Sequence, residues 1–349
     1  MIRKRIHRAS KVECKWRVKN FLFFFRSTLQ KGVVGEPLEL SLLQVEEAYR
    51  DLAVTDKPMI AWMSIQEKTL VQTRLGLAQR GSLLSYQQPL LSSKTINVHP
   101  DAPPYPLLPL EEHRLAPTAC VHVCTEEEQF HLRSLKVTFP IARNIETSTR
   151  EQAEDQQWHQ LRHVRVTSSR FREVCFVLDR NAEGLAERML KGTRQTADMK
   201  RGREMEFIAA TEYCKLRNIS YTPVGLVIHP DAPWLGSSPD GLVYDPTTQP
   251  PFGLVEFKSP NVKNYVDCSY LKMKDGSLVL PESHMYYWQV QGQLLLTGLQ
   301  WCDFVVFAQE DMLVQRIHVD PTTTATIRKK ADWFYYYVYM PKYLAFKKR

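Results

Sequence analysis

Two short stretches near the middle of the chain carry the residue types that metal-dependent phosphodiester cleavage needs. One is Ser237-Ser-Pro-Asp-Gly241, which puts Asp240 just ahead of an apolar run, and the other is Gly253-Leu-Val-Glu-Phe-Lys258. Alternate residues of a strand share a face, so Glu256 and Lys258 are expected to project from the same side. Two carboxylates can hold a hard divalent cation, which polarises a phosphate and activates a water molecule. An ammonium group beside them can steer that water or stabilise the charge that develops on the phosphate.

The same spacing also has an ordinary structural explanation. A glutamate followed two residues later by a lysine occurs as a plain ion pair in surface hairpins. Val255 and Phe257 on the opposite face of the strand favour a buried position, where an unpaired charge needs a partner or an ion. The spacing alone leaves both interpretations open.

Glu206 lies near the start of a helix predicted over residues 200–217. An acid in that position commonly just stabilises the helix, because it lies near the positive end of the helix dipole. Gly202, four residues earlier, permits the close approach of another backbone and favours a site role instead.

A second predicted helix, over residues 283–296, mixes polar and aromatic side chains. Its period places Tyr286, Gln289 and Gln293 on one face, with Trp288, Leu295 and Leu296 on the other side. The polar face is either a solvent-exposed surface or the wall of a site.

Together these residues resemble the YqaJ-like viral recombinase family, which includes phage lambda exonuclease and belongs to the PD-(D/E)xK nuclease superfamily. The resemblance covers roughly residues 145–319, about half of the chain, and its blocks occur in the family's order: Arg165-Val-Thr-Ser-Ser-Arg-Phe171, Gly202-x-x-x-Glu206, Ser238-Pro-Asp-Gly241, Glu256-Phe-Lys258 and Tyr286-x-x-Gln289 with Gln293. The first 140 or so residues have no counterpart in the family, and the loop Asn261–Leu280 is longer than a minimal connector.

The resemblance implies a role for each matched residue. Asp240, Glu256 and the backbone carbonyl of Phe257 would ligate Mg²⁺ or Mn²⁺, and Glu206 would support the metal or its water. Lys258 would be the catalytic lysine, and Gln289 would lie near the scissile group. The residues implied near a DNA phosphate are Ser169, Arg170 and Ser238.

The function implied is that of a metal-dependent deoxyribonuclease, an exonuclease acting on double-stranded DNA with free ends, with a role in recombination, repair or mobile-element biology. The family's homotrimer is one assembly that the resemblance suggests. Three alternatives stay open: a structure-specific endonuclease, a catalytically silent DNA-binding module of the same fold, and an N-terminal half that is the working part. The last includes a zinc module around Cys120, His122 and Cys124, with His113 nearby, but no second ligand pair follows at finger spacing.

The order of the strands and helices that must position these residues predicts the fold class. We expect an α/β (α+β) restriction-endonuclease-like core with a central mixed sheet flanked by helices. Strands are expected over residues 221–229, 240–244, 253–258, 302–308 and 313–319, and helices over 146–163, from 167 or 168 to 177, 200–217, 283–296 and 321–344. A further strand is expected at Leu135–Ile141, and helix-like stretches at Pro37–Ala53 and Ser64–Leu77.

Charge and proline divide the 349 residues into three parts. Of the net charge of +8, residues 1–35 supply most, with ten basic residues and one acid, and form a basic tail. Residues 36–143 form a poorly assignable region with a proline-rich linker at 89–117, and residues 144–349 form the nuclease domain. Residues 161–203 hold eleven basic and five acidic residues, either a phosphate-binding surface or a solvated helical face.

The basic tail favours a nuclear location or, alternatively, a mitochondrial transit peptide. Seven irregularly spaced cysteines and no secretory signal favour a reducing compartment. The mean hydropathy of -0.34, with no apolar run of membrane-spanning length, argues against a membrane partner.

Overall fold

The structure is a computed structural model that describes residues 70–73, 76–79, 94–192 and 197–348. The chain divides into two compact units, Met1–Gln88 and Pro89–Arg349. In the first unit the described elements are two antiparallel strands, β1 (Leu70–Thr73) and β2 (Gly76–Gln79). The predicted helix at residues 64–77 is therefore wrong where the structure describes it, since the β-branched Val71 and Thr73 favour a strand and Gly76 disfavours a helix. The basic tail and the predicted helix at residues 37–53 lie outside the described residues.

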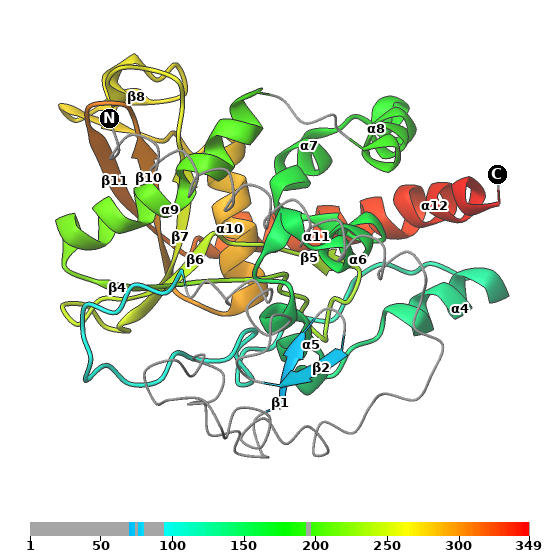
Figure 1. The fold of residues 1–349 in the computed structure, drawn as a ribbon. Coiled ribbons are helices and arrows are strands. Elements are labelled where there is room, and N and C mark those ends of the chain that lie inside the picture. The colour runs from blue at the N-terminus through cyan, green and yellow to red at the C-terminus, as the bar shows by residue number, and fades with distance from the viewer. Residues whose placement is uncertain (1–69, 74–75, 80–93, 193–196, 349) are drawn as a thin grey trace, which may run out of the picture. The chain divides into compact units, whose positions relative to one another are not determined.

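The second unit is built on a five-stranded mixed sheet with the order β11-β10-β7-β6-β4. β7 and β10 are parallel, and the other neighbours are antiparallel. This agrees with the predicted fold class (Figure 1). The strands are β4 (Ser220–Pro223), β6 (Gly241–Tyr244), β7 (Phe252–Lys258), β10 (Trp301–Phe307) and β11 (Met312–His318).

Helices cover both faces of this sheet. On one face, α9 (Ala197–Arg217) packs Ala209, Ala210 and Tyr213 into a cluster with buried side chains of β4, β6, β7 and β10. On the other face, α10 (Met285–Thr297) joins the larger core cluster, which takes in Leu254 of β7 and Phe304 of β10. Consecutive residues of β7 thus enter different cores, as the period of a strand requires.

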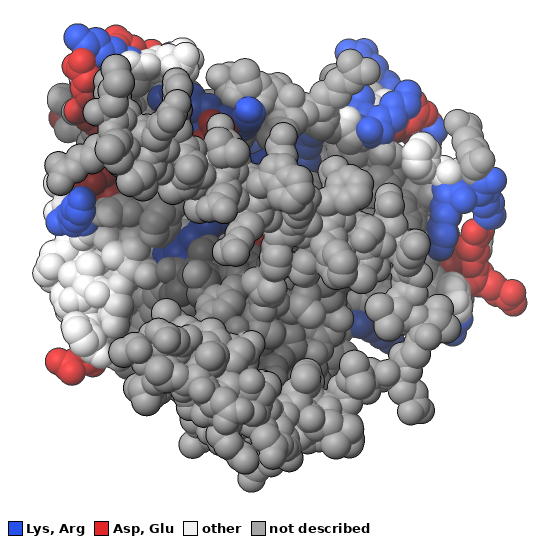
Figure 2. Space-filling view, viewed as in Figure 1, with Lys and Arg blue, Asp and Glu red and all other residues white. Residues whose placement is uncertain are grey.

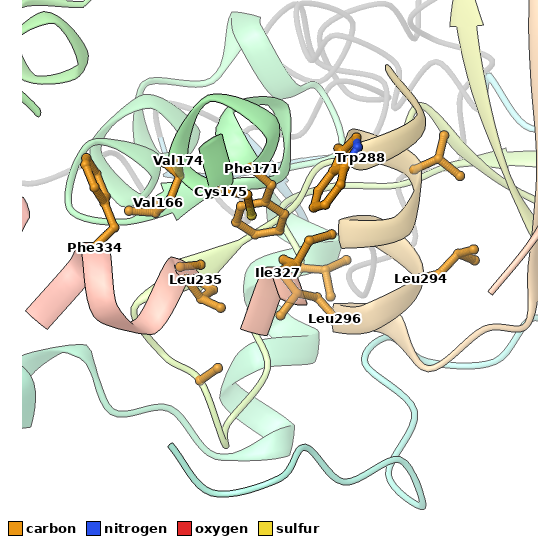
Figure 3. Packing of buried hydrophobic residues seen from close by; sticks show 14 of the residues in the cluster. Val166, Phe171, Val174, Cys175, Leu235, Trp288, Leu294, Leu296, Ile327 and Phe334 are labelled. Carbon is orange, nitrogen blue, oxygen red and sulfur yellow. The ribbon is translucent and has the colours of Figure 1, made fainter. Parts of the chain in front are cut away.

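A helical layer continues the larger core beyond the sheet. Its elements are η4 (Ser168–Arg170), α7 (Phe171–Phe176), α8 (Asp179–Lys191), α11 (Pro321–Phe334), the π-helix η6 (Tyr335–Tyr339) and α12 (Met340–Lys347). The helix α6 (Gln156–His163) packs instead against a small separate cluster of Ile145, Leu226 and Ile228. Figure 3 shows Phe171 of this layer near Trp288 of α10 and Ile327 of α11, whereas Val174 lies toward Val166 and Phe334. α10 approaches closely because residue 292 is glycine, where a Cβ would lie 2.2 Å from the Phe171 ring.

Short elements complete the unit. β3 (Val166–Thr167) pairs in parallel with β5 (Leu235–Gly236). Within the long predicted loop 261–280, after η5 (Tyr265–Asp267), β8 (Lys272–Lys274) and β9 (Ser277–Val279) form a hairpin. Its two turn residues, Asp275 and Gly276, both have positive φ angles, as a tight hairpin turn favours.

The proline-rich segment belongs to the same unit as the sheet. The compact unit begins at Pro89 rather than at the predicted boundary of 144, and Leu108 and Leu115 are buried in the main core. His113 fixes the segment to the end of α10, because its Nε2 lies 2.8 Å from the carbonyl oxygen of Leu295. Prolines prevent regular structure here, but they do not prevent apolar side chains from packing.

The predicted strand at residues 135–141 is wrong, because two helices meet there. α4 (Glu126–Leu135) begins with a capping box between Thr125 and Glu128, and α5 (Phe139–Ser148) begins at the cap residue Thr138. The predicted helix at 146–163 is likewise divided into the end of α5, the turn η3 (Gln152–Glu154) and α6. These threonine caps, rather than the apolar pattern, set the helix boundaries.

No helix among the described residues is long and apolar enough to cross a membrane. In Figure 2, Lys and Arg side chains with acidic ones among them lie where Figure 1 places α8 and the β8 hairpin. The basic stretch at residues 161–203 does not form one uniform surface. Arg165 is buried and donates to the carbonyls of Pro233 and Leu161, and Arg170 pairs with Glu173.

Candidate active site

Most of the predicted site residues line one pocket of about 730 Å³. It lies where β6 begins and β7 ends, between α9 and α10. The predicted residues in its wall are Ser169, Glu206, Asp240, Phe257, Lys258, Tyr286 and Gln289, and the residues that the sequence did not indicate include Lys94, Arg150 and Arg162.

The pairing of β6 with β7 sets the position of Asp240. Gly241 pairs with Val255 in the antiparallel register, so Asp240, one residue earlier, lies beside Glu256. One carboxylate oxygen of Asp240 accepts a 2.7 Å hydrogen bond from the backbone N–H of Phe257. The backbone of β7 therefore fixes this acid directly.

Tyr221 and Gly241 fix the backbone at the start of β6. The Tyr221 hydroxyl donates a 3.0 Å hydrogen bond to the carbonyl oxygen of Asp240. A Cβ at Gly241 would lie 2.0 Å from the Tyr221 ring, so the ring can occupy this place only because residue 241 is glycine.

Glu256 is the centre of the site, with only 1% of its surface exposed. One carboxylate oxygen accepts hydrogen bonds from the Lys258 ammonium and, at 2.6 Å, from the Gln289 amide. The other accepts a 2.6 Å hydrogen bond from the Gln293 amide. The Lys258 ammonium also lies 4.9 Å from the centre of the Tyr286 ring. The prediction that Tyr286, Gln289 and Gln293 share a helix face is confirmed, and this face is the wall of the site.

The acidic groups at the pocket raise one another's pKa values. Burial, reinforced by Glu256 and Glu206, raises the pKa of Asp240 well above its usual value. Burial also raises the pKa of Glu206 to about 7, with Glu256 acting in the same direction and Lys94 opposing it. Burial alone would lower the pKa of Lys258, but Glu256 and Asp240 outweigh it and raise that pKa above its usual value. Three acids thus lie close to one half-buried lysine.

Glu206 reaches the pocket from α9, as predicted, but Gly202 does not serve a close approach. In the described part of the chain, a Cβ at Gly202 would meet no atom within 4 Å outside its own helix turn. Gly202 lines the pocket instead, where its missing side chain leaves open space beside Glu206.

The three residues predicted near a DNA phosphate have different surroundings. Ser169 lines the pocket, and its hydroxyl lies 3.3 Å from that of Thr167. The Ser238 hydroxyl accepts 3.0 Å hydrogen bonds from the Trp158 indole and the Arg162 guanidinium. Arg170 instead donates to Glu173 and is not part of the pocket wall.

Arg162 is the basic residue that lies beside Ser238 at the pocket wall. Its guanidinium lies 4.2 Å from the centre of the Trp158 ring and reaches both Ser238 and Thr167. Burial lowers the pKa of Arg162 to about 10, with Arg170 acting in the same direction, so the group is still charged at neutral pH. The only local signal for it is the four-residue spacing of Trp158 and Arg162 on a helix.

Lys94 is the second basic residue that the sequence did not indicate. It begins the described part of the second unit, and Ile96 nearby pairs with Tyr221 as an isolated bridge at the edge strand β4. The Lys94 ammonium lies 3.6 Å from the Glu151 carboxylate at the pocket. A segment that lies before the matched family blocks thus adds a charge to the site.

Part of the chain is similar to known proteins. Residues 157–300 match the YqaJ-like viral recombinase domain. No curated protein matches the chain. An alkaline exonuclease from Laribacter hongkongensis is 30% identical over 56% of this chain and 97% of its own, with a TM-score of 0.44. A second structure of that enzyme, in complex with dAMP, gives the same values. A phage-related exonuclease from Haemophilus somnus 129PT is 14% identical over 54% of this chain and 98% of its own, with a TM-score of 0.38.

The matched family domain, residues 157–300, includes Glu206, Asp240 and Lys258 of the pocket, whereas Lys94 and Arg150 lie before it. The chain belongs to the YqaJ-like viral recombinase family.

Proposed function

We propose that this protein is a metal-dependent deoxyribonuclease that hydrolyses phosphodiester bonds of double-stranded DNA from free ends. The observation that carries the proposal is the convergence of Asp240, Lys258 and Glu206 in the wall of one pocket, in a chain similar to exonucleases. Glu256 is buried directly behind this wall, where it accepts hydrogen bonds from Lys258 and Gln289. A surface hairpin with an ordinary Glu–Lys pair would leave Glu256 exposed, whereas here it is buried.

The residues present fit a hard divalent cation. The available donors are carboxylate oxygens of Asp240 and Glu256, with the Phe257 carbonyl on the same strand, and Mg²⁺ or Mn²⁺ prefers oxygen. Burial, with Glu256 and Glu206 acting in the same direction, holds the pKa of Asp240 high, and a cation bound between these acids would offset both effects. A bound cation supplies Lewis-acid activation of the scissile phosphate and of the attacking water.

The protein's own groups then have distinct roles. Lys258, charged and fixed between Glu256 and the Tyr286 ring, stabilises the charge that develops on the phosphate oxygens. Gln289 lies at the pocket wall, where its amide orients Glu256 towards the substrate side. Glu206, at the pocket wall on α9, would support the bound cation or accept a proton from the attacking water.

The end preference is proposed from the relatives and from one feature of the pocket. Arg162, Ser169 and Ser238 form a small group of phosphate-binding side chains beside the acids. Arginine suits a terminal phosphate because its planar group can donate two parallel hydrogen bonds. DNA recombination, repair or mobile-element biology is the setting in which we place this activity.

The test is degradation of linear duplex DNA in Mg²⁺ or Mn²⁺, with 5′-phosphate or 5′-hydroxyl ends, by the wild type and by Lys258→Ala. Lys263→Ala is the matched control, because that lysine pairs with Glu310 and does not line the pocket. We expect the wild type and the control to degrade linear DNA and Lys258→Ala to be inactive but folded.

Covalently closed circles complete the test. An exonuclease leaves closed circles intact, so their cleavage would replace the proposal by an endonuclease. A folded wild type that binds DNA as tightly as Lys258→Ala and cleaves with neither metal would show a binding module instead.

A further inference from the structure

A second group of metal-binding side chain types lies in the segment ahead of α4, away from the active-site pocket. Residues 118–125 alternate between half-buried and exposed, so Cys120, His122 and Cys124 turn to the protein side. Val121 and Val123 between them are 87% and 90% exposed. Two apolar side chains are thus left in solvent while a histidine and two cysteines face inward.

Three ligand atoms converge at this place. The His122 Nε2, the Cys124 Sγ and a Glu128 carboxylate oxygen all lie within 4.8 Å of one another. The first and third are 3.2 Å apart. In a tetrahedral zinc site, bond lengths of 2.0–2.3 Å place the ligand atoms roughly 3.4–3.8 Å apart, so small side-chain movements suffice.

The capping box of α4 fixes the Glu128 side chain in this position. It is buried, and its Oε2 accepts a 2.9 Å hydrogen bond from the backbone N–H of Thr125 in the capping box of α4. The ring of His122 packs edge-on against Tyr337, with the centroids 5.1 Å apart, and the Tyr337 hydroxyl donates to the carbonyl of Val121. The helix cap and η6 therefore orient two of the three side chains.

We propose that Cys124, His122 and Glu128 bind one zinc ion, with water as the fourth ligand. One sulfur, one nitrogen and one oxygen donor suit Zn²⁺, whereas Mg²⁺ prefers an all-oxygen site. Cys120 faces the same side but is not part of the convergent group, so it is not a ligand. None of the three ligands lines the active-site pocket. The ion would join the segment ahead of α4 to the first turn of that helix, which carries Glu128.

The test is a titration of the full-length protein with Co²⁺, a spectroscopic substitute for Zn²⁺, in excess Mg²⁺. A cysteine ligand gives a sulfur-to-cobalt charge-transfer band in the near ultraviolet, which the oxygen donors of the nuclease site cannot produce. We expect the band to saturate at one equivalent, to disappear when Zn²⁺ is added, and to be absent in Cys124→Ser.

Two matched variants make the result specific. Cys120→Ser removes the neighbouring half-buried thiol and should keep the band, whereas His122→Ala should lose it. All variants are checked for folding by circular dichroism and by nuclease activity. A folded wild type without the band, or a band that survives in Cys124→Ser, would show that His122 and Glu128 form only an ion pair. Loss of the band in Cys120→Ser would overturn the three-ligand assignment.

Discussion

Asp240 is tied to Phe257 by a 2.7 Å hydrogen bond from the backbone N–H of β7 to its carboxylate. The acid that precedes β6 is therefore placed by the same strand that carries Glu256 and Lys258. An amide side chain can accept this hydrogen bond as well as a carboxylate can. Position and charge at residue 240 can thus be separated experimentally.

Asp240→Asn should retain the fold but lose metal binding. Since the asparagine oxygen keeps the bond to Phe257 and removes a crowded charge, we expect the metal-free melting temperature to be unchanged or higher. At a hundredfold excess of Mn²⁺ over its dissociation constant, the wild type should gain about 2.7 kcal/mol of stability. The variant should gain none and should not cleave DNA. Equal stabilisation of both proteins by Mn²⁺ would remove Asp240 from the ligands.

Gln293→Leu should destabilise the metal-free protein by about 1–3 kcal/mol, because it leaves a buried Glu256 oxygen without its donor. Urea unfolding without metal measures this change. Gln289→Leu is the comparison, since that side chain donates to the same carboxylate but is only half-buried at the pocket wall. We expect Gln289→Leu to lose less stability than Gln293→Leu. A larger loss for Gln289→Leu would contradict the argument from burial.

Metal binding should strengthen as the pH rises through about 7. The pKa of Glu206 is raised from 4.5 to about 7, and that of Asp240 is also raised, so the metal-free pocket holds protons that must leave when a cation binds. An acid whose pKa is higher in the folded state also makes the metal-free protein less stable as the pH rises from about 4.5 to 7. Melting temperatures with and without Mn²⁺ should therefore diverge between pH 5 and 8. A constant difference would mean that neither acid takes part.

Lys94→Ala should shift metal binding to higher pH. Lys94 lowers the pKa of Glu206, so its removal should raise that pKa further and delay metal binding to higher pH. We also expect a higher KM for DNA, since one cation at the pocket is lost. Lys263→Ala, whose lysine is an exposed partner of Glu310, should behave like the wild type. Identical pH profiles for both variants would show that Lys94 acts only through Glu151.

Arg162→Lys should weaken the distinction between phosphorylated and unphosphorylated ends. Lysine keeps the charge but loses the planar group that lies over Trp158 and reaches Ser238. We expect the ratio of degradation rates on 5′-phosphate and 5′-hydroxyl duplexes to approach one. Arg170→Lys, at a residue that pairs with Glu173, should leave the ratio unchanged. If Arg170→Lys changes the ratio and Arg162→Lys does not, the phosphate-binding role belongs to Arg170.

Local sequence pattern was sufficient for the parts of the site that lie on regular elements. The period of two puts Glu256 and Lys258 on one face of β7, and the helical period puts Tyr286, Gln289 and Gln293 on one face of α10. Both relationships depend only on backbone geometry within a single element, which is why they can be read without knowing the rest of the fold.

Pairing between distant segments was decided by the tertiary structure alone. Arg162 rather than Arg170 meets Ser238 because the end of α6 packs beside the loop that leads to β6. Lys94 reaches Glu206 because its segment lies at the edge of β4. Gly202 leaves open space in the pocket instead of meeting another backbone.

The sequence by itself determined the acids, the lysine and the helix that face one another, because their order and spacing are local and chemically restrictive. The tertiary structure decided which cations join them and that the proline-rich segment belongs to the core, with Leu108 buried. Those outcomes depend on contacts between residues far apart in the chain. Such contacts are set by the packing of whole elements, and no local period encodes them.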